Sequence, residues 1–171
     1  MKKIIITIVT LSVFSLLNFT ANAQTVKLGH VNISELLKVM PEYKKAEIDL
    51  QGFAKQLENA MAQMQQDYQQ KVAKYYEEEA GMIPAIKETR QNEIVDLEKR
   101  IQTLQSKSES QLVDKQVQLL KPIEDKVTTA IKSFAQQESY TYIFDASPGQ
   151  TLLYAPESND VTGKIKAKLG L

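Results

Sequence analysis

The sequence predicts an α+β protein in which a long antiparallel helical hairpin, forming a coiled-coil arm, stands on a small β-rich oligomerisation body. Two patterns support this fold class. Over residues 42–138 apolar side chains recur at alternating steps of three and four, the heptad spacing of a coiled coil. Towards both ends of the chain lie runs rich in β-branched and aromatic residues, at 26–31, 140–144 and 151–154.

Residues 1–23 have the features of a secretory signal peptide. A basic start is followed by an apolar run over residues 4–19 and by a small-x-small cleavage site that ends at Ala23. We therefore expect cleavage after Ala23, export, and no stable membrane insertion. The alternative is a retained membrane anchor, for which this apolar run is short.

Charge and composition exclude several function classes. Loss of residues 1–23 removes two lysines and no acid, which changes a formal net charge of zero to −2. General nucleic-acid binding needs a basic surface, so we do not expect it. With one histidine and no cysteine, the chain offers no multi-histidine zinc site and no thiol chemistry. We predict no catalytic residues, no metal and no cofactor.

The first part of the body, residues 24–41, is predicted to hold a strand at 26–31 and a short helix. Asn32 followed by Glu35 resembles a capping box at the start of that helix. Pro41 is then expected at the first position of a long helix.

Two long helices are predicted for the arm, at 42–79 and 85–138. Gly81 and Pro84 separate them, as expected for a residue just past one helix and a residue just inside the next. At 1.5 Å per residue the helices would be about 57 Å and about 80 Å long.

Folding the chain back at 81–84 brings apolar residues opposite one another in four successive layers. The expected pairs are Phe53 with Leu112, Met61 with Leu104, Met64 with Ile101, and Tyr68 with Leu97. The second predicted helix is longer than the first, and Pro122 lies near the root of the hairpin. Because an internal proline kinks a helix, we predict a hinge at Pro122, with the arm spanning 42–122.

Residues 123–171 are predicted to complete the body. An amphipathic helix at 123–138 is followed by a β-hairpin over 140–154 and a last helix at 160–169. A body of this size has a marginal core, so we expect a homo-oligomer. The candidate oligomerisation residues are Val31, Ile143, Phe144, Leu152, Leu153 and Tyr154.

The order of these pieces resembles the Skp/OmpH family of periplasmic chaperones over the whole mature chain. The pieces that carry the resemblance are Gly29 and Val31 in the first strand, Pro41-Glu42-Tyr43, Lys121-Pro122-Ile123, Phe144-Asp145, Leu153-Tyr154, and Asn159-Asp160-Val161-Thr162. The resemblance implies a periplasmic homotrimer whose β-rich body and three arms enclose a cavity. It also implies that the cavity holds unfolded outer-membrane proteins without ATP.

One departure from the family pattern, the charge of the arm, bears on function. Residues 42–122 carry 12 basic and 14 acidic residues, whereas some members of the family are strongly basic. We therefore do not carry over a lipopolysaccharide site or a capture mechanism driven by charge. His30 stands where an aromatic residue is common, and we expect it to be structural.

Aromatic and methionine side chains in the distal half of the arm are the candidate client-contacting residues, because flexible apolar side chains suit contact with many sequences. They are Met61, Met64, Tyr68, Tyr75, Tyr76, Met82 and Ile83. For Met61, Met64 and Tyr68 the competing interpretation is packing between the two helices. The competing function is a structural or adaptor coiled-coil protein of the cell envelope.

Overall fold

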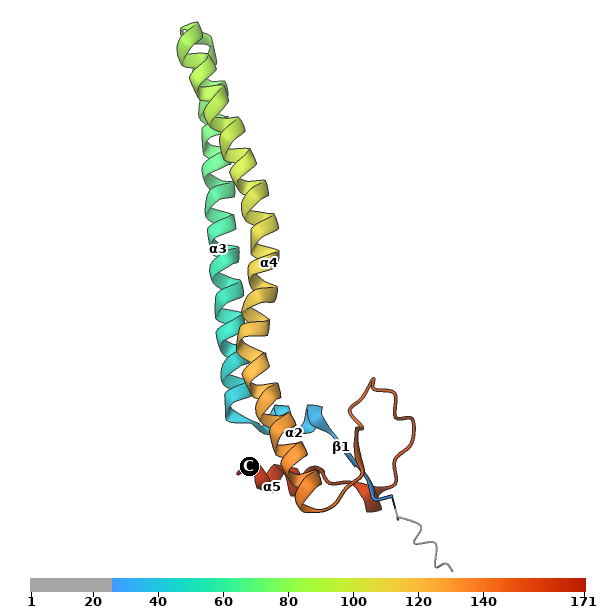
Figure 1. Ribbon diagram of the computed structural model, residues 1–171. Coiled ribbons are helices and arrows are strands. Elements are labelled where there is room, and N and C mark those ends of the chain that lie inside the picture. The colour runs from blue at the N-terminus through green and yellow to red at the C-terminus, as the bar shows by residue number, and fades with distance from the viewer. Residues whose placement is uncertain (1–25) are drawn as a thin grey trace, which may run out of the picture.

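The computed structural model describes residues 26–171, and it consists of a long arm standing on a small body (Figure 1). The expected signal peptide and cleavage site lie outside the described residues. In the arm are α3 (Pro41–Glu78), the short 3-10 helix η1 (Glu79–Gly81) and α4 (Pro84–Gln137). In the body are β1 (Leu28–Val31), α2 (Ile33–Val39), β2 (Tyr142–Asp145), η2 (Glu157–Asn159) and α5 (Thr162–Lys168).

The two long helices begin at prolines, as their sequence pattern predicts. Pro41 and Pro84 occupy the first turn of α3 and α4, where a missing backbone N–H removes no helical hydrogen bond. The helices lie side by side and run in opposite directions (Figure 1). Near the tip, Lys71 of α3 contacts Glu93 of α4 at 2.9 Å. At the root, Glu42 of α3 forms an ion pair with Lys126 of α4.

Pro122 does not interrupt α4, which continues through it as one helix down to Gln137. Beside Pro122, the side chains of Ile123 and Ala46 are buried at the edge of an open groove of about 390 Å³. The lower end of α4 is therefore continuous with the body, and the predicted division of the chain at Pro122 stays a prediction.

The sheet differs from the predicted hairpin. β2 pairs with β1 in parallel, with Leu28 opposite Tyr142 and Val31 opposite Asp145. Residues 151–154 form no strand, so the predicted β-hairpin over 140–154 is wrong. The sequence pattern measures strand propensity but does not identify the partner strand. In the structure the described sheet has only two strands.

The core lies where α2, the lower end of α4 and α5 meet the sheet. Its most deeply buried side chains are Val31, Leu36, Met40, Val127, Val161 and Ile165. Hydrogen bonds connect the elements of the same region. Asn32 caps α2 as predicted, since its side chain accepts a hydrogen bond from the Glu35 N–H at 3.0 Å. The Asn32 N–H in turn donates to Thr162 Oγ1 at 2.9 Å, which ties α2 to α5.

Two glycines give opposite predictions for the free energy of unfolding. A Cβ on Gly29 would lie 2.8 Å from Cε1 of Tyr140, and that ring packs against Phe134 with centroids 5.7 Å apart. We expect Gly29→Ala to lower the free energy of unfolding by about 1–3 kcal/mol through overpacking. A Cβ on Gly52 of α3 meets nothing within 4 Å, so Gly52→Ala should raise it by about 1 kcal/mol.

Chemical denaturation of the two variants and the parent protein, at one protein concentration, measures both effects. Equal stability of all three proteins would contradict the assignment of Gly29 to a crowded site and of Gly52 to an open helix surface.

Candidate functional surfaces

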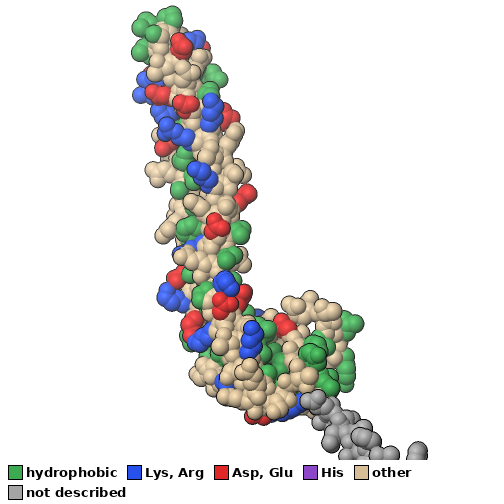
Figure 2. All heavy atoms as spheres, viewed as in Figure 1, with side chains coloured by type: hydrophobic (Ala, Val, Ile, Leu, Met, Phe, Trp, Pro, Cys, Tyr) green, Lys and Arg blue, Asp and Glu red, His purple; other side chains and the backbone are tan. Residues whose placement is uncertain are grey.

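The tip of the arm carries large apolar side chains that no other part of residues 26–171 covers. Tyr76 is 70% exposed and Ile83 is 64% exposed, and Ile86 one turn into α4 is also exposed. Met82 between them is half-buried. Figure 2 shows hydrophobic side chains gathered at this end of the molecule. Ile86 was not among the predicted residues, although it lies only three residues after Ile83, about one helical turn.

Tyr75 lies inside the arm, in contrast to its neighbour Tyr76. Its side chain is only 6% exposed, so the assignment of Tyr75 to a client-contacting surface is wrong for this structure. The Tyr75 hydroxyl accepts a hydrogen bond from Gln91 Nε2 at 2.7 Å and donates to Glu79 Oε1 at 3.4 Å. Tyr75 therefore joins α3, η1 and α4 at the tip.

Ion pairs around Tyr75 hold the tip together. Lys87 Nζ lies 2.5 Å from Glu79 Oε1, and Arg90 lies 3.8 Å from Glu78. The hydrogen bond from Lys87 lowers the pKa of the Glu79 carboxyl, and the same bond raises the pKa of the Lys87 ammonium. Both groups are therefore charged at neutral pH, and their ion pair links η1 to α4 next to the apolar side chains of the tip.

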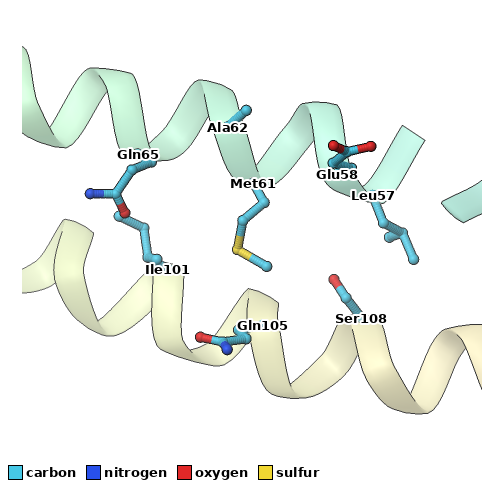
Figure 3. Close-up of a pocket in the computed structure, with 8 residues that line it drawn as sticks. All are labelled: Leu57, Glu58, Met61, Ala62, Gln65, Ile101, Gln105 and Ser108. Atoms are coloured by element: carbon cyan, nitrogen blue, oxygen red, sulfur yellow. The ribbon is translucent and has the colours of Figure 1, made fainter. Parts of the chain in front are cut away.

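The mid-arm candidates lie between the helices. Met61, Met64 and Tyr68 are each half-buried. Met61 points towards α4 at an open groove of about 510 Å³, as Figure 3 shows. These three side chains thus contribute to packing within the arm and retain some exposure, in agreement with the competing interpretation given above.

On the body, an apolar surface is formed by one face of the sheet and by the loop after β2. Side chains at every second position of a strand share a face, which places Tyr142 and Phe144 together; their rings stack with centroids 6.1 Å apart. Leu28 lies opposite Tyr142 on β1. We call this set the sheet-and-loop surface; its exposed members are Val26, Leu28, Tyr142, Phe144, Leu153 and Tyr154.

The other predicted body residues are divided between the core and this surface. Val31 is buried in the core, and Ile143 is half-buried and packs against it. Leu152 is half-buried in the loop. Sequence reasoning missed Val26, Leu28 and Tyr142, although the alternation of the strands, read with the correct pairing, would have identified Leu28 and Tyr142.

The loop after β2 is anchored at both ends. At its start, Ser147 Oγ accepts a hydrogen bond from the Ser34 N–H at 3.0 Å. At its end, His30 Nε2 lies 3.0 Å from the Pro156 carbonyl oxygen, so His30 is structural, as expected. Between these anchors Leu153 and Tyr154 project outwards, with 98% and 81% of their surfaces exposed. The two anchors therefore attach the ends of a loop that exposes two large apolar side chains to solvent.

Residues 26–171 lack two other features that would point to a function. This part of the chain contains no group of three histidine, cysteine, aspartate or glutamate side chains able to hold a metal ion. No helix within it combines the length and apolar character that crossing a membrane requires.

Comparisons with known proteins agree on one family. The family model described as "Outer membrane protein (OmpH-like)" matches residues 27–169. The chaperone protein Skp of Yersinia enterocolitica is 24% identical over 150 residues, which cover 85% of this chain and 87% of that protein. A crystal structure from Caulobacter crescentus, described as an OmpH-like outer membrane chaperone, superposes with a TM-score of 0.73 at 10% identity, and covers 84% of this chain and 83% of its own.

At that identity the crystal structure supports the fold, and the match of the family model over residues 27–169 carries the assignment. The chain belongs to the Skp/OmpH family.

Proposed function

We propose that this protein is an ATP-independent holdase chaperone of the periplasm that binds unfolded outer-membrane proteins and prevents their aggregation. The observation that carries this proposal is the tip of the arm, where Tyr76, Ile83 and Ile86 are exposed beside the hydrogen bond of Tyr75 with Gln91 and the ion pair of Lys87 with Glu79. An apolar surface held far from the body suits contact with a large, extended chain. The name of the Yersinia enterocolitica relative, a chaperone, supports the same reading.

The active unit of this proposal is a homotrimer of mature chains, cleaved after Ala23. Parallel sheets are normally covered on both faces, and a sheet of two strands is marginal alone. Here one face packs on the core, while the sheet-and-loop surface is open in the single chain. If the sheet-and-loop surfaces of three chains packed against one another, all three would be covered. The three arms would then enclose a cavity for the client.

Capture in such a cavity would rest on many weak contacts. Each exposed side chain offers little affinity alone, but several arms acting together raise the effective concentration of binding sites. Release needs no nucleotide, because single contacts break readily. The nearly balanced charge of residues 42–122 makes apolar contact the main source of affinity.

The tip is tested by removing its apolar side chains. We expect the double variant Tyr76→Ser and Ile83→Ser to need several-fold more protein than the parent to suppress aggregation of an unfolded β-barrel protein without nucleotide. Contact with a client buries each side chain only in part, so the loss is a fraction of the about 1.5–3 kcal/mol that full burial of a large apolar side chain contributes. The measurement is light scattering during dilution of the client from denaturant.

The matched control for the tip is Ile48→Ser, since Ile48 is 67% exposed at the root of the arm and should contribute little. An unchanged tip variant would place the client surface elsewhere. A parent protein with no activity would instead favour the structural or adaptor coiled-coil alternative.

The assembly is tested at Leu153. Because Leu153 is 98% exposed, Leu153→Asp should leave the single chain folded but place a charge in the proposed interface. We expect light scattering to give a trimer for the parent and smaller species for the variant, with Val113→Asp on the exposed arm as the control. A monomeric parent at micromolar concentration would contradict the trimer.

Salt dependence tests the apolar mechanism. Raising the salt from low concentration to several hundred millimolar shortens the Debye length below about 10 Å and screens exposed charges. We expect the affinity for an unfolded client, measured by fluorescence anisotropy, to change less than about threefold over that range. A loss of affinity of tenfold or more would favour electrostatic capture.

A further inference from the structure

We propose that the groove beside Met61, here called the mid-arm groove, is a binding subsite for a tyrosine side chain of an unfolded client. The groove lies between α3 and α4 and has a volume of about 510 Å³ (Figure 3). That the tyrosine belongs to a client rests on the proposed function, whereas the subsite itself can be tested with a short peptide.

The floor of the mid-arm groove is apolar. Leu57 and Met61 of α3 and Ile101 of α4 line it, and each of them is half-buried. Figure 3 shows Met61 pointing across the groove towards α4. A thioether makes favourable contacts with the edge of an aromatic ring. Ligand pockets typically measure about 300–1,000 Å³, so the groove has room for one aromatic side chain, whose burial would supply most of the affinity.

A buried hydroxyl at the groove selects for a polar group on that ring. Figure 3 shows the Ser108 hydroxyl directed towards α3. Within residues 26–171, Ser108 Oγ is buried and has no hydrogen-bond partner. Three threonines of α4 instead donate to the carbonyl four residues earlier, as Thr103 does to Lys99 at 2.8 Å. A buried hydroxyl without a partner is costly, and the phenol of tyrosine can donate a hydrogen bond to it or accept one from it.

The charge at the rim of the groove also restricts the occupant. Among the described residues, Glu58 is the one charged residue that lines the groove. It forms an exposed ion pair with Lys55 at 2.8 Å, which offsets its charge only in part. A carboxylate that enters the groove would meet a charge of the same sign, whereas a neutral phenol would not. The groove therefore fits tyrosine and disfavours an acidic side chain.

The groove of about 390 Å³ beside Pro122 has a different chemistry. Its charged lining side chains are already paired with one another, Glu42 with Lys126 and Lys45 with Asp49. No hydroxyl among the described residues lines it. That groove can accept an apolar side chain, but it has no unpaired buried group that would distinguish tyrosine from phenylalanine.

Tyrosine also suits the proposed class of client. Outer-membrane barrels carry girdles of aromatic residues at both membrane interfaces, and these side chains are exposed while the chain is unfolded. A tyrosine in the mid-arm groove would bury its ring and give Ser108 a hydrogen-bond partner. Each arm would thereby add one weak contact with a side chain that recurs along the client.

Methyl NMR of the mature protein tests the subsite directly. From Gln24 onwards the sequence contains four methionines, Met40, Met61, Met64 and Met82. The Met61 methyl signal, assigned with the variant Met61→Leu, reports on the groove. Met82 reports on the tip, and Met40, which is buried in the core, is the internal control. The probes are capped peptides of glycine, serine and threonine with tyrosine, phenylalanine, leucine or aspartate at the centre.

We expect the tyrosine peptide, at millimolar concentration, to shift the Met61 signal through the ring current and to leave the Met40 signal in place. Its affinity at Met61 should exceed that of the phenylalanine peptide by about two- to tenfold, the effect of one hydrogen bond. The leucine peptide should bind more weakly than the tyrosine peptide, and the aspartate peptide should leave the Met61 signal unmoved.

Variants of Ser108 test the role of its hydroxyl. Ser108→Ala should lower the affinity of the tyrosine peptide by about two- to tenfold and leave that of the phenylalanine peptide unchanged. The matched control is Ser110→Ala, an exposed serine two residues away, which should keep the preference for tyrosine. Ser108→Leu fills the groove and should abolish the Met61 shift with every peptide; Ser108→Ala keeps the test valid if the leucine variant fails to fold.

The proposal is overturned if no peptide moves the Met61 signal, or if the phenylalanine, leucine or aspartate peptide binds there as tightly as the tyrosine peptide. It is also overturned if Ser108→Ala keeps the preference for tyrosine. An aggregation assay separates the subsite from the proposed function. A protein that binds the tyrosine peptide at Met61 but does not suppress aggregation keeps the subsite and rejects the holdase, and the reverse pair of results keeps the holdase and rejects the subsite.

Discussion

The parallel pairing of β1 with β2 is the constraint on which the rest of the molecule depends. Two parallel strands cannot be joined by a tight turn, because the chain must return to the starting end of the sheet before the second strand begins. In this protein the return path is the whole arm, α3 out and α4 back, so that residues 28–31 and 142–145 become neighbours. The arm and the body are thus connected through α4, because the lower end of this helix contributes Val127 and Phe134 to the core of the body.

The same arrangement explains why one face of the sheet is open. The core side is covered by α2, the lower end of α4 and α5. On the opposite face, Leu28, Tyr142 and Phe144 are exposed in the described part of the chain. The loop after β2, anchored by Ser147 and by the contact of His30 with Pro156, enlarges this surface and leaves it uncovered.

Local patterns predicted the helices, and non-local relationships were harder to predict. The heptad spacing, the prolines at the starts of α3 and α4 and the cap at Asn32 act within one or two turns, so a single sequence displays them. The partner of residues 142–145 depends on a strand more than a hundred residues away, and the predicted hairpin was wrong for that reason. At the tip, adjacent Tyr75 and Tyr76 point to different environments, and only the rotation of α3 relative to α4 decides which of them is buried.

The long separation of the two strands also sets the order in which the molecule forms. The hydrogen bond from the Thr141 N–H to the Lys27 carbonyl at 2.8 Å joins residues that lie 114 positions apart in the sequence, and contacts of such high sequence separation form slowly from an open coil. Helices propagate far faster, by local steps. If α3 and α4 packed against each other progressively from the turn at 79–84, residues 41 and 126 would become neighbours. The two strands would then be close in space and could pair after a short diffusive search. The arm would thus guide the folding of its own body, and β1 would stay unpaired until the two long helices had brought β2 beside it.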